Sequence, residues 1–188
     1  VESLSQKMEM IPVVHEHSAA VAADYFNYSN RELGRKSLAL VTAGPGITNS
    51  LTGIAGAWLE SRELLVIAGQ VKSTDLKSGS LRQRGIQELD GVSLVSSIAQ
   101  QALRLTEIPS MNSWENALAV DPEGRLGPVF LEICVDVQGQ ETTVPLGLTE
   151  FSSRIQAGAA PGLAKQANAV IDAVMRSSRP LLLLGGDV

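Results

Sequence analysis

SLALVTAGPGITNSLTGIAGAWLES, residues 37–61, contains the pattern that decides the fold. It begins with an apolar run of strand length, turns at Gly44-Pro45-Gly46, and continues over residues 47–61 with apolar side chains at helical spacing. A strand, a glycine turn and a helix in that order are typical of parallel sheets covered by helices. We therefore expect the turn at the carboxyl edge of such a sheet, where these folds bind ligands.

The same alternation continues along the chain. Further strand-length apolar runs and helical segments predict strands at residues 63–68, 128–135 and 180–184 and helices at residues 17–28 and 163–175. Continuous apolar runs are expected where a strand is buried on both faces. The predicted fold class is therefore α/β, with a parallel sheet covered by helices on both faces.

The predicted elements fall into two groups separated by a segment without periodicity. Residues 138–161 are rich in Gly, Ala and Pro, which is typical of an inter-domain linker. We predict a first domain over residues 1–140 that lacks its first strand, a linker over 141–160, and the truncated start of a second α/β domain over 161–188.

Composition excludes several classes of function. The 188 residues carry 15 basic and 20 acidic side chains, and no Lys/Arg cluster alternates with aromatics, so nucleic acid is not an expected partner. No apolar run approaches the ~20 residues of a membrane-spanning helix, so a membrane is not expected either. The only cysteine, Cys134, lies in an apolar run, which excludes an internal disulfide and predicts a buried thiol. We expect a cytoplasmic protein.

Taken alone, the Gly44-Pro45-Gly46 turn is either a structural connection or a ligand cradle. Its glycines allow close approach of the backbone. The turn lacks the Lys-Ser/Thr ending of a P-loop and the spacing of a dinucleotide fingerprint, so neither nucleotide motif is supported. Thr48 and Asn49 could cap the following helix or present polar groups to a ligand.

Glu16 lies between two histidines at an expected strand-to-helix junction. Its carboxylate could simply stabilise the N-terminus of the helix. His15 and His17 suggest a metal site, but no further Cys, His or paired carboxylate occurs at ligand spacing. The residues by themselves leave the role of Glu16 open.

Four segments read together resemble the pyrimidine-binding domain of the acetolactate synthase group of thiamin-diphosphate enzymes. In order, they are HEHSAAVAADYFNY (15–28), LALVTAGPGITNSLTGIAGAWLESRELLVIAGQV (38–71), GIQELDGVSLVSSIAQQALRL (85–105) and GRLGPVFLEICVDVQ (124–138). Their order and spacing fit that family over about residues 1–140. The final RPLLLLGGDV is similar to the start of the family's central domain.

The resemblance implies roles for individual residues. Glu16 matches the catalytic glutamate that hydrogen-bonds a pyrimidine ring nitrogen in a dry site and so promotes removal of the thiazolium C2 proton. Gly44, Pro45, Gly46 and Asn49 match positions close to the cofactor. Gln87 matches a position on the substrate side.

The resemblance also implies an activity and its cofactors. The family decarboxylates a pyruvate-like 2-oxo acid on thiamin diphosphate and transfers the acyl unit to a carbonyl acceptor. Its Mg²⁺ is held by a Gly-Asp-Gly and a downstream Asn in a C-terminal domain, a motif that this sequence lacks. FAD, which some relatives bind in the central domain, stays undecided. The open alternatives are a simple 2-oxo acid decarboxylase and a non-catalytic binding or scaffold module of the same fold.

Two further expectations concern assembly and substrate choice. Family active sites lie between subunits, so a homodimer or tetramer is implied and the chain by itself is expected to be inactive. The segment between Gln70 and Glu88 carries four basic residues: Lys72, Lys77, Arg82 and Arg84. They form either a solvated surface loop or a recognition site for an anionic acceptor.

Overall fold

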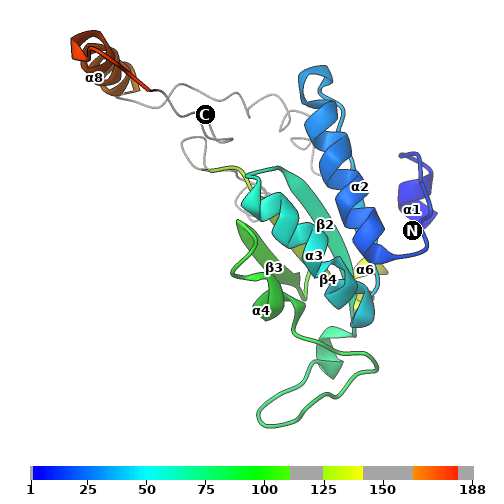
Figure 1. The fold of residues 1–188 in the computed structure, drawn as a ribbon. Helices are drawn as coiled ribbons and strands as arrows, with labels where there is room; N and C mark the ends of the chain where they lie inside the picture. Colours follow the sequence, from blue (N-terminus) through cyan, green and yellow to red (C-terminus); the bar gives the residue numbers. More distant parts are fainter. Residues whose placement is uncertain (1, 111–124, 142–162, 182–188) are drawn as a thin grey trace.

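A four-stranded parallel sheet lies at the centre of the computed structural model, which describes residues 2–110, 125–141 and 163–181 (Figure 1). The strand order is β1-β2-β4-β3, and all three strand pairs are parallel. The strands are β1 (Leu38–Val41), β2 (Leu64–Gln70), β3 (Gln101–Leu105) and β4 (Pro128–Cys134). The predicted α/β fold class with a parallel sheet is confirmed.

Helices precede and follow the strands. The described helices are α1 (Glu2–Ser5), α2 (Glu16–Ser29), α3 (Pro45–Leu59), α4 (Gly91–Val95), α6 (Val135–Gln138) and α8 (Leu163–Arg176), with short 3-10 turns η1 (Arg31–Leu33) and η2 (Ser73–Asp75). Helix α3 begins two residues earlier than predicted, because proline, which fixes φ and needs no N–H partner, suits a first turn. Strand β4 ends one residue earlier, since Val135 begins α6.

Helices α2 and α3 pack side by side on one face of the sheet (Figure 1). The parallel register pairs Ala39 with Val66, so their side chains share that face. With Ile47 and Ile54 of α3 they belong to a fully or nearly fully buried core. The helices approach so closely that a Cβ atom at Gly53 would lie 2.6 Å from the Cβ of Ala20. Small residues therefore set the spacing between these two helices.

Helix α4 packs on the same face, where Val95 joins the core around Ile47. The helical layer expected on the opposite face is not tested by the described residues. Helix α8 matches its predicted position in the sequence, and its residues 167–176 are exposed. Figure 1 shows α8 apart from the sheet.

Several sequence expectations need correction or lie outside the described part. The apolar segment before Glu16 is not a strand: Ile11 and Val14 are 76% and 106% exposed. This segment does not pair with the outer edge of β1 or with any other described strand, so it has no strand partner for its backbone hydrogen bonds. In the predicted strand 180–184, Pro180 and Leu181 form no strand, and residues 182–184 lie outside the described residues. Residues 142–160 of the predicted linker also lie outside them.

Strand β3 and helix α4 were not predicted. All five residues of β3 are half-buried, and its sequence, QALRL, has neither a continuous apolar run nor strict alternation. It is recognised only by its pairing with β4 in the structure.

Candidate functional site

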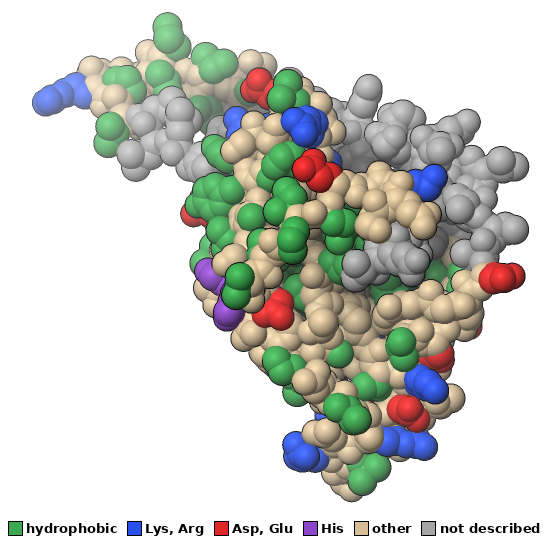
Figure 2. Space-filling model, turned by 90° about the vertical axis from the view of Figure 1, so that its right-hand side faces the viewer, with side chains coloured by type: hydrophobic (Ala, Val, Ile, Leu, Met, Phe, Trp, Pro, Cys, Tyr) green, Lys and Arg blue, Asp and Glu red, His purple; other side chains and the backbone are tan. Residues whose placement is uncertain are grey.

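The predicted site residues gather where the N-terminal ends of α2 and α3 meet beside the carboxyl end of β1. Glu16 is the first residue of α2. This position also fits the simpler interpretation, in which its carboxylate stabilises the helix N-terminus. His15 caps this helix: its Nδ1 accepts a hydrogen bond from the backbone N–H of His17 at 3.2 Å. The two imidazoles are the purple groups at the molecular surface in Figure 2. This cap accounts for His15 without a metal.

Glu16 and Asn49 are in direct contact. The side-chain amide of Asn49 donates to Oε2 of Glu16 at 3.0 Å. This bond is the main cause that lowers the pKa of the Glu16 carboxyl, and a backbone hydrogen bond and the nearby His15 act in the same direction against a smaller effect of burial. The arrangement therefore favours an ionised Glu16 carboxylate at the N-terminal end of α2.

The surroundings of Glu16 correct two expectations. Glu16 is only half-buried and Asn49 is exposed, so the described residues alone do not form the dry site that the family role requires. Thr48 and Asn49 are not caps either, since the N-cap of α3 is Gly44, which makes no side-chain capping bond. The Thr48 hydroxyl donates to the carbonyl of Pro45 at 3.1 Å, inside the helix.

Both glycines of the turn are required by close approaches. Gly44 adopts φ 63°, and a Cβ atom there would lie 2.5 Å from the carbonyl oxygen of Gln87. A Cβ atom at Gly46 would lie 2.6 Å from Oγ1 of Thr42 and 3.6 Å from Oε1 of Glu16. The missing side chains thus let Thr42 and the Gln87 backbone pack directly against the turn, close to the Glu16 carboxylate.

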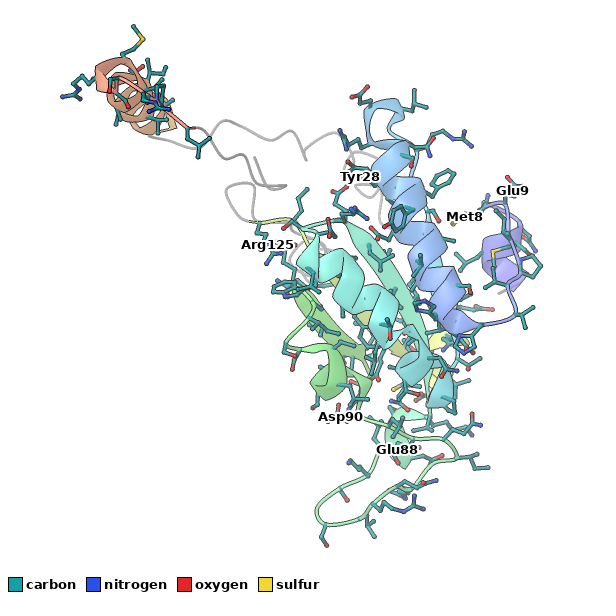
Figure 3. All side chains as sticks on the ribbon, viewed as in Figure 1. Met8, Glu9, Tyr28, Glu88, Asp90 and Arg125 are labelled. Atoms are coloured by element: carbon teal, nitrogen blue, oxygen red, sulfur yellow. The ribbon has the colours of Figure 1, made fainter. Side chains whose placement is uncertain are left out.

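Gln87 is held by its neighbour Glu88, which the sequence analysis did not single out. Its carboxylate accepts hydrogen bonds from three backbone N–H groups, those of Lys77 (2.5 Å), Arg84 (2.7 Å) and Gly85 (3.0 Å). Burial alone would raise the pKa of Glu88, but these three donors together lower it. Figure 3 shows Glu88 at the base of the loop between β2 and α4. Its carboxylate therefore holds together the backbone of the loop that carries Gln87.

The four basic residues of this loop, Lys72, Lys77, Arg82 and Arg84, are exposed. Exposure fits the solvated-loop interpretation, and the alternative of an anionic acceptor site stays a hypothesis. The site residues come from three separate parts of the chain: the start of α2, the turn before α3, and the loop before α4. The structure joins Glu16 to Asn49 and Gln87 to Gly44.

An ion pair beneath α4 that joins a fully buried carboxylate to a partly exposed arginine was also missed. Glu132 of β4 is completely buried and accepts from Nε of Arg104 at 2.6 Å, while a second guanidinium nitrogen donates to Asp90 at 2.7 Å. A Cβ atom at Gly91 would overlap the Glu132 carboxylate, so Gly91 lets α4 lie directly over it. The signal was available, because a single carboxylate inside the apolar run 128–135 requires a buried partner.

The described residues contain no group of three or more His, Cys, Asp or Glu side chains that could hold a metal ion. Cys134 is free and buried as predicted, and burial raises the pKa of its thiol. In this part of the chain no helix has the length and apolarity needed to cross a membrane.

Comparison with known proteins identifies the family of the chain. Residues 1–94, half of the chain, match the family model described as "Thiamine pyrophosphate enzyme, N-terminal TPP binding domain". The chain belongs to this thiamine pyrophosphate enzyme family. The matched region includes Glu16, the Gly44-Pro45-Gly46 turn, Asn49 and Gln87, so all the predicted site residues lie inside the family domain.

The chain is also similar to named members of the family. It is 33% identical over 181 residues to an acetolactate synthase of Arthrospira platensis, which covers 93% of this chain and 29% of the relative. A catabolic acetolactate synthase of Raoultella terrigena is 32% identical over 184 residues, covering 97% of this chain and 31% of the relative. An acetolactate synthase large subunit of Haemophilus influenzae is 29% identical over 183 residues, covering 95% of this chain and 30% of the relative. The chain thus spans about three tenths of the length of these relatives.

Proposed function

We propose that the full-length protein carrying this chain is a thiamin-diphosphate enzyme of the acetolactate synthase type. It decarboxylates a pyruvate-like 2-oxo acid and transfers the acyl unit to a carbonyl acceptor. The observation that carries the proposal is the Glu16 carboxylate, whose pKa is lowered by the Asn49 amide and which lies beside the glycine turn. Family membership and relatives named acetolactate synthase support it.

The residues present fit the pyrimidine end of the cofactor. A pyrimidine ring nitrogen needs a carboxylate within hydrogen-bonding reach and space for a flat ring beside it. Glu16 is only half-buried and supplies the first. Gly46 adds no side chain at the position 3.6 Å from Oε1 of Glu16. When bound, thiamin diphosphate would supply a carbon nucleophile and an electron sink for decarboxylation.

Each site residue then has a distinct task. Glu16 would be the catalytic residue: its carboxyl would give a proton to the ring nitrogen, and the resulting carboxylate would accept the hydrogen bond from that N–H. Gly44, Pro45, Gly46 and Asn49 lie on the cofactor side. Gln87, brought to Gly44 by the loop that Glu88 gathers, lies on the substrate side.

The remaining parts of the proposal concern components outside this chain. Mg²⁺ would bind the diphosphate through residues that this sequence does not contain, and FAD stays undecided. A homodimer or tetramer would complete the site at a subunit interface, which would also exclude water from Glu16. A cytoplasmic location stays a prediction.

A Glu16→Gln variant of the full-length protein tests the proposed role. We expect it to fold, to bind thiamin diphosphate with Mg²⁺ in calorimetric titration, and to slow hydrogen–deuterium exchange at the cofactor C2 by about a hundredfold or more, as for loss of a general acid–base group. The matched control is Glu32→Gln, which removes an exposed carboxylate in η1. Exchange at the control rate in Glu16→Gln would overturn the assignment.

The same titration separates the enzyme from the non-catalytic alternative. A full-length protein that binds thiamin diphosphate and Mg²⁺, together with a 188-residue chain that does not, supports a site shared with other domains. A full-length protein that binds neither would favour a binding or scaffold module. Product analysis with pyruvate distinguishes carboligation from simple decarboxylation.

A further inference from the structure

The contact between Asn49 and Glu16 follows from the way α2 and α3 pack. Glu16 lies one helical turn before Ala20, and Asn49 lies one turn before Gly53. The two helices approach closely at Ala20 and Gly53, since a Cβ atom at Gly53 would lie 2.6 Å from the Ala20 Cβ. The next residues along the same two faces are therefore Glu16 and Asn49. The helix register places the amide opposite the carboxylate.

The two oxygens of the Glu16 carboxylate have different surroundings. Oε2 accepts the amide N–H of Asn49, whereas Oε1 lies on the side of Gly46, 3.6 Å from where a Cβ atom would be. An amide does not titrate, so its donor is present at every pH at which the carboxylate is ionised. Asn49 thus fixes one oxygen, while the other lies on the side of Gly46.

We propose that Asn49 is the positioning residue of Glu16, acting on the cofactor only through that carboxylate and not as a cofactor ligand itself. This inference rests on the proposed function, in which Glu16 is the catalytic residue. Its bond orients the carboxylate and keeps it ionised, in agreement with the lowered pKa of Glu16. Asparagine is a poor residue for a helix interior, and here its amide contacts another helix, while the Thr48 hydroxyl bonds to its own backbone.

The first readout needs neither cofactor nor activity. In cofactor-free full-length protein with ¹³C-labelled glutamate side chains, the Glu16 carboxyl signal is assigned by its loss in Glu16→Gln and followed with pH. We expect Asn49→Ala to move its titration midpoint upward, because a donor to the ionised form is removed. Asn49→Asp keeps the shape but places a second carboxylate there, so its shift should be larger. Thr48→Ala, one residue away and without contact to Glu16, should leave the midpoint unchanged.

The second readout distinguishes positioning from direct binding. In the loaded enzyme we expect Asn49→Ala to slow C2 exchange about tenfold or more near pH 7, the loss expected for one hydrogen bond to a charged group. The acid limb of the exchange rate should move to higher pH, and the Kd for thiamin diphosphate should stay within about threefold of the Thr48→Ala value. Thermal melting of each variant checks that the domain is folded.

Two outcomes would overturn the inference. Weaker cofactor binding with an unchanged Glu16 midpoint would make Asn49 a direct ligand, and behaviour identical to Thr48→Ala would leave it no role. Failure of the proposed function gives a different result, namely normal exchange in Glu16→Gln, and the cofactor-free titration remains interpretable in that case.

Discussion

The carbonyl oxygen of Gln87 lies 2.5 Å from the position that a Cβ atom would occupy at Gly44. Both residues have positive φ, 59° for Gln87 and 63° for Gly44, so two unusual backbone conformations interlock at the edge of the sheet. A left-handed conformation costs a non-glycine residue about 1–2 kcal/mol, and such strain persists only where the surroundings hold it. At Gln87 the holding contacts are the turn at Gly44 and the bonds to Glu88.

Replacing Gly44 by alanine tests this interlock. Gly44→Ala adds both backbone strain and a collision with the Gln87 carbonyl, so we expect a loss of free energy of unfolding of about 2–4 kcal/mol. Gly34→Ala is the control for a positive φ without a collision: Gly34 has φ 65° and ψ 13°, against φ 63° and ψ −113° at Gly44, and no atom lies within 4 Å of its added Cβ. The control should lose only about 1–2 kcal/mol in urea denaturation of this chain. Equal losses of free energy of unfolding in the two variants would mean that the loop carrying Gln87 moves away from the added Cβ atom at no cost.

Glu88→Gln is expected to loosen the loop between Lys77 and Gly85. The carboxylate accepts three N–H groups, whereas an amide presents its own donors to at least one of them. Trypsin cleavage after Lys77, Arg82 and Arg84 should become several-fold faster, since proteolysis follows local opening. Asp75→Asn, in the same segment, removes an equal charge and should digest like the unchanged chain. Unchanged cleavage in Glu88→Gln would show that other contacts order the loop.

The loop should also respond to acid through Glu88. Its folded-state pKa is lowered, so its stabilising contribution is fully present above the ordinary glutamate value, about 4.3, and is lost as pH falls through the folded pKa. The backbone amide signals of Lys77, Arg84 and Gly85 should shift together in an NMR titration, with a midpoint below that ordinary value. A midpoint above it would show that burial, and not the three donors, dominates. Glu88→Gln should abolish the common titration.

The ion pair beneath α4 should be costly to break and much less costly to replace. Arg104→Met leaves the Glu132 charge buried without its partner, so we expect a loss of about 3–5 kcal/mol. Combining it with Glu132→Leu should recover most of that loss, since an apolar pair of similar volume needs no desolvated charge. Lys36→Met breaks an exposed pair with Glu63 and should cost less than about 1 kcal/mol. No recovery in the double variant would show that the pair itself is favourable.

Strong local patterns explain which elements were predictable. Residues 37–42, 63–68 and 128–135 are short, mainly apolar runs bounded by turns, and α3 has a long apolar stripe, so each element is specified by its own residues. Strand β3 lacks such a pattern because all five of its residues are half-buried, so neither face is marked by apolar residues. The segment before Glu16 was wrongly predicted as a strand, because its apolar residues are exposed and pair with no described strand.

By itself, the sequence determined the α/β class, the main elements and the family, together with Glu16 as the residue on which the proposed chemistry depends. These properties follow from residue types at short spacing and from motifs in register, which need no knowledge of distance. Only the tertiary structure decided that Asn49, 33 positions away, bonds to Glu16, that Glu88 gathers the loop of Gln87, and that Arg104 neutralises Glu132. The physical reason is that such contacts depend on helix spacing and loop paths. Ala20 and Gly53 set that spacing where α2 meets α3.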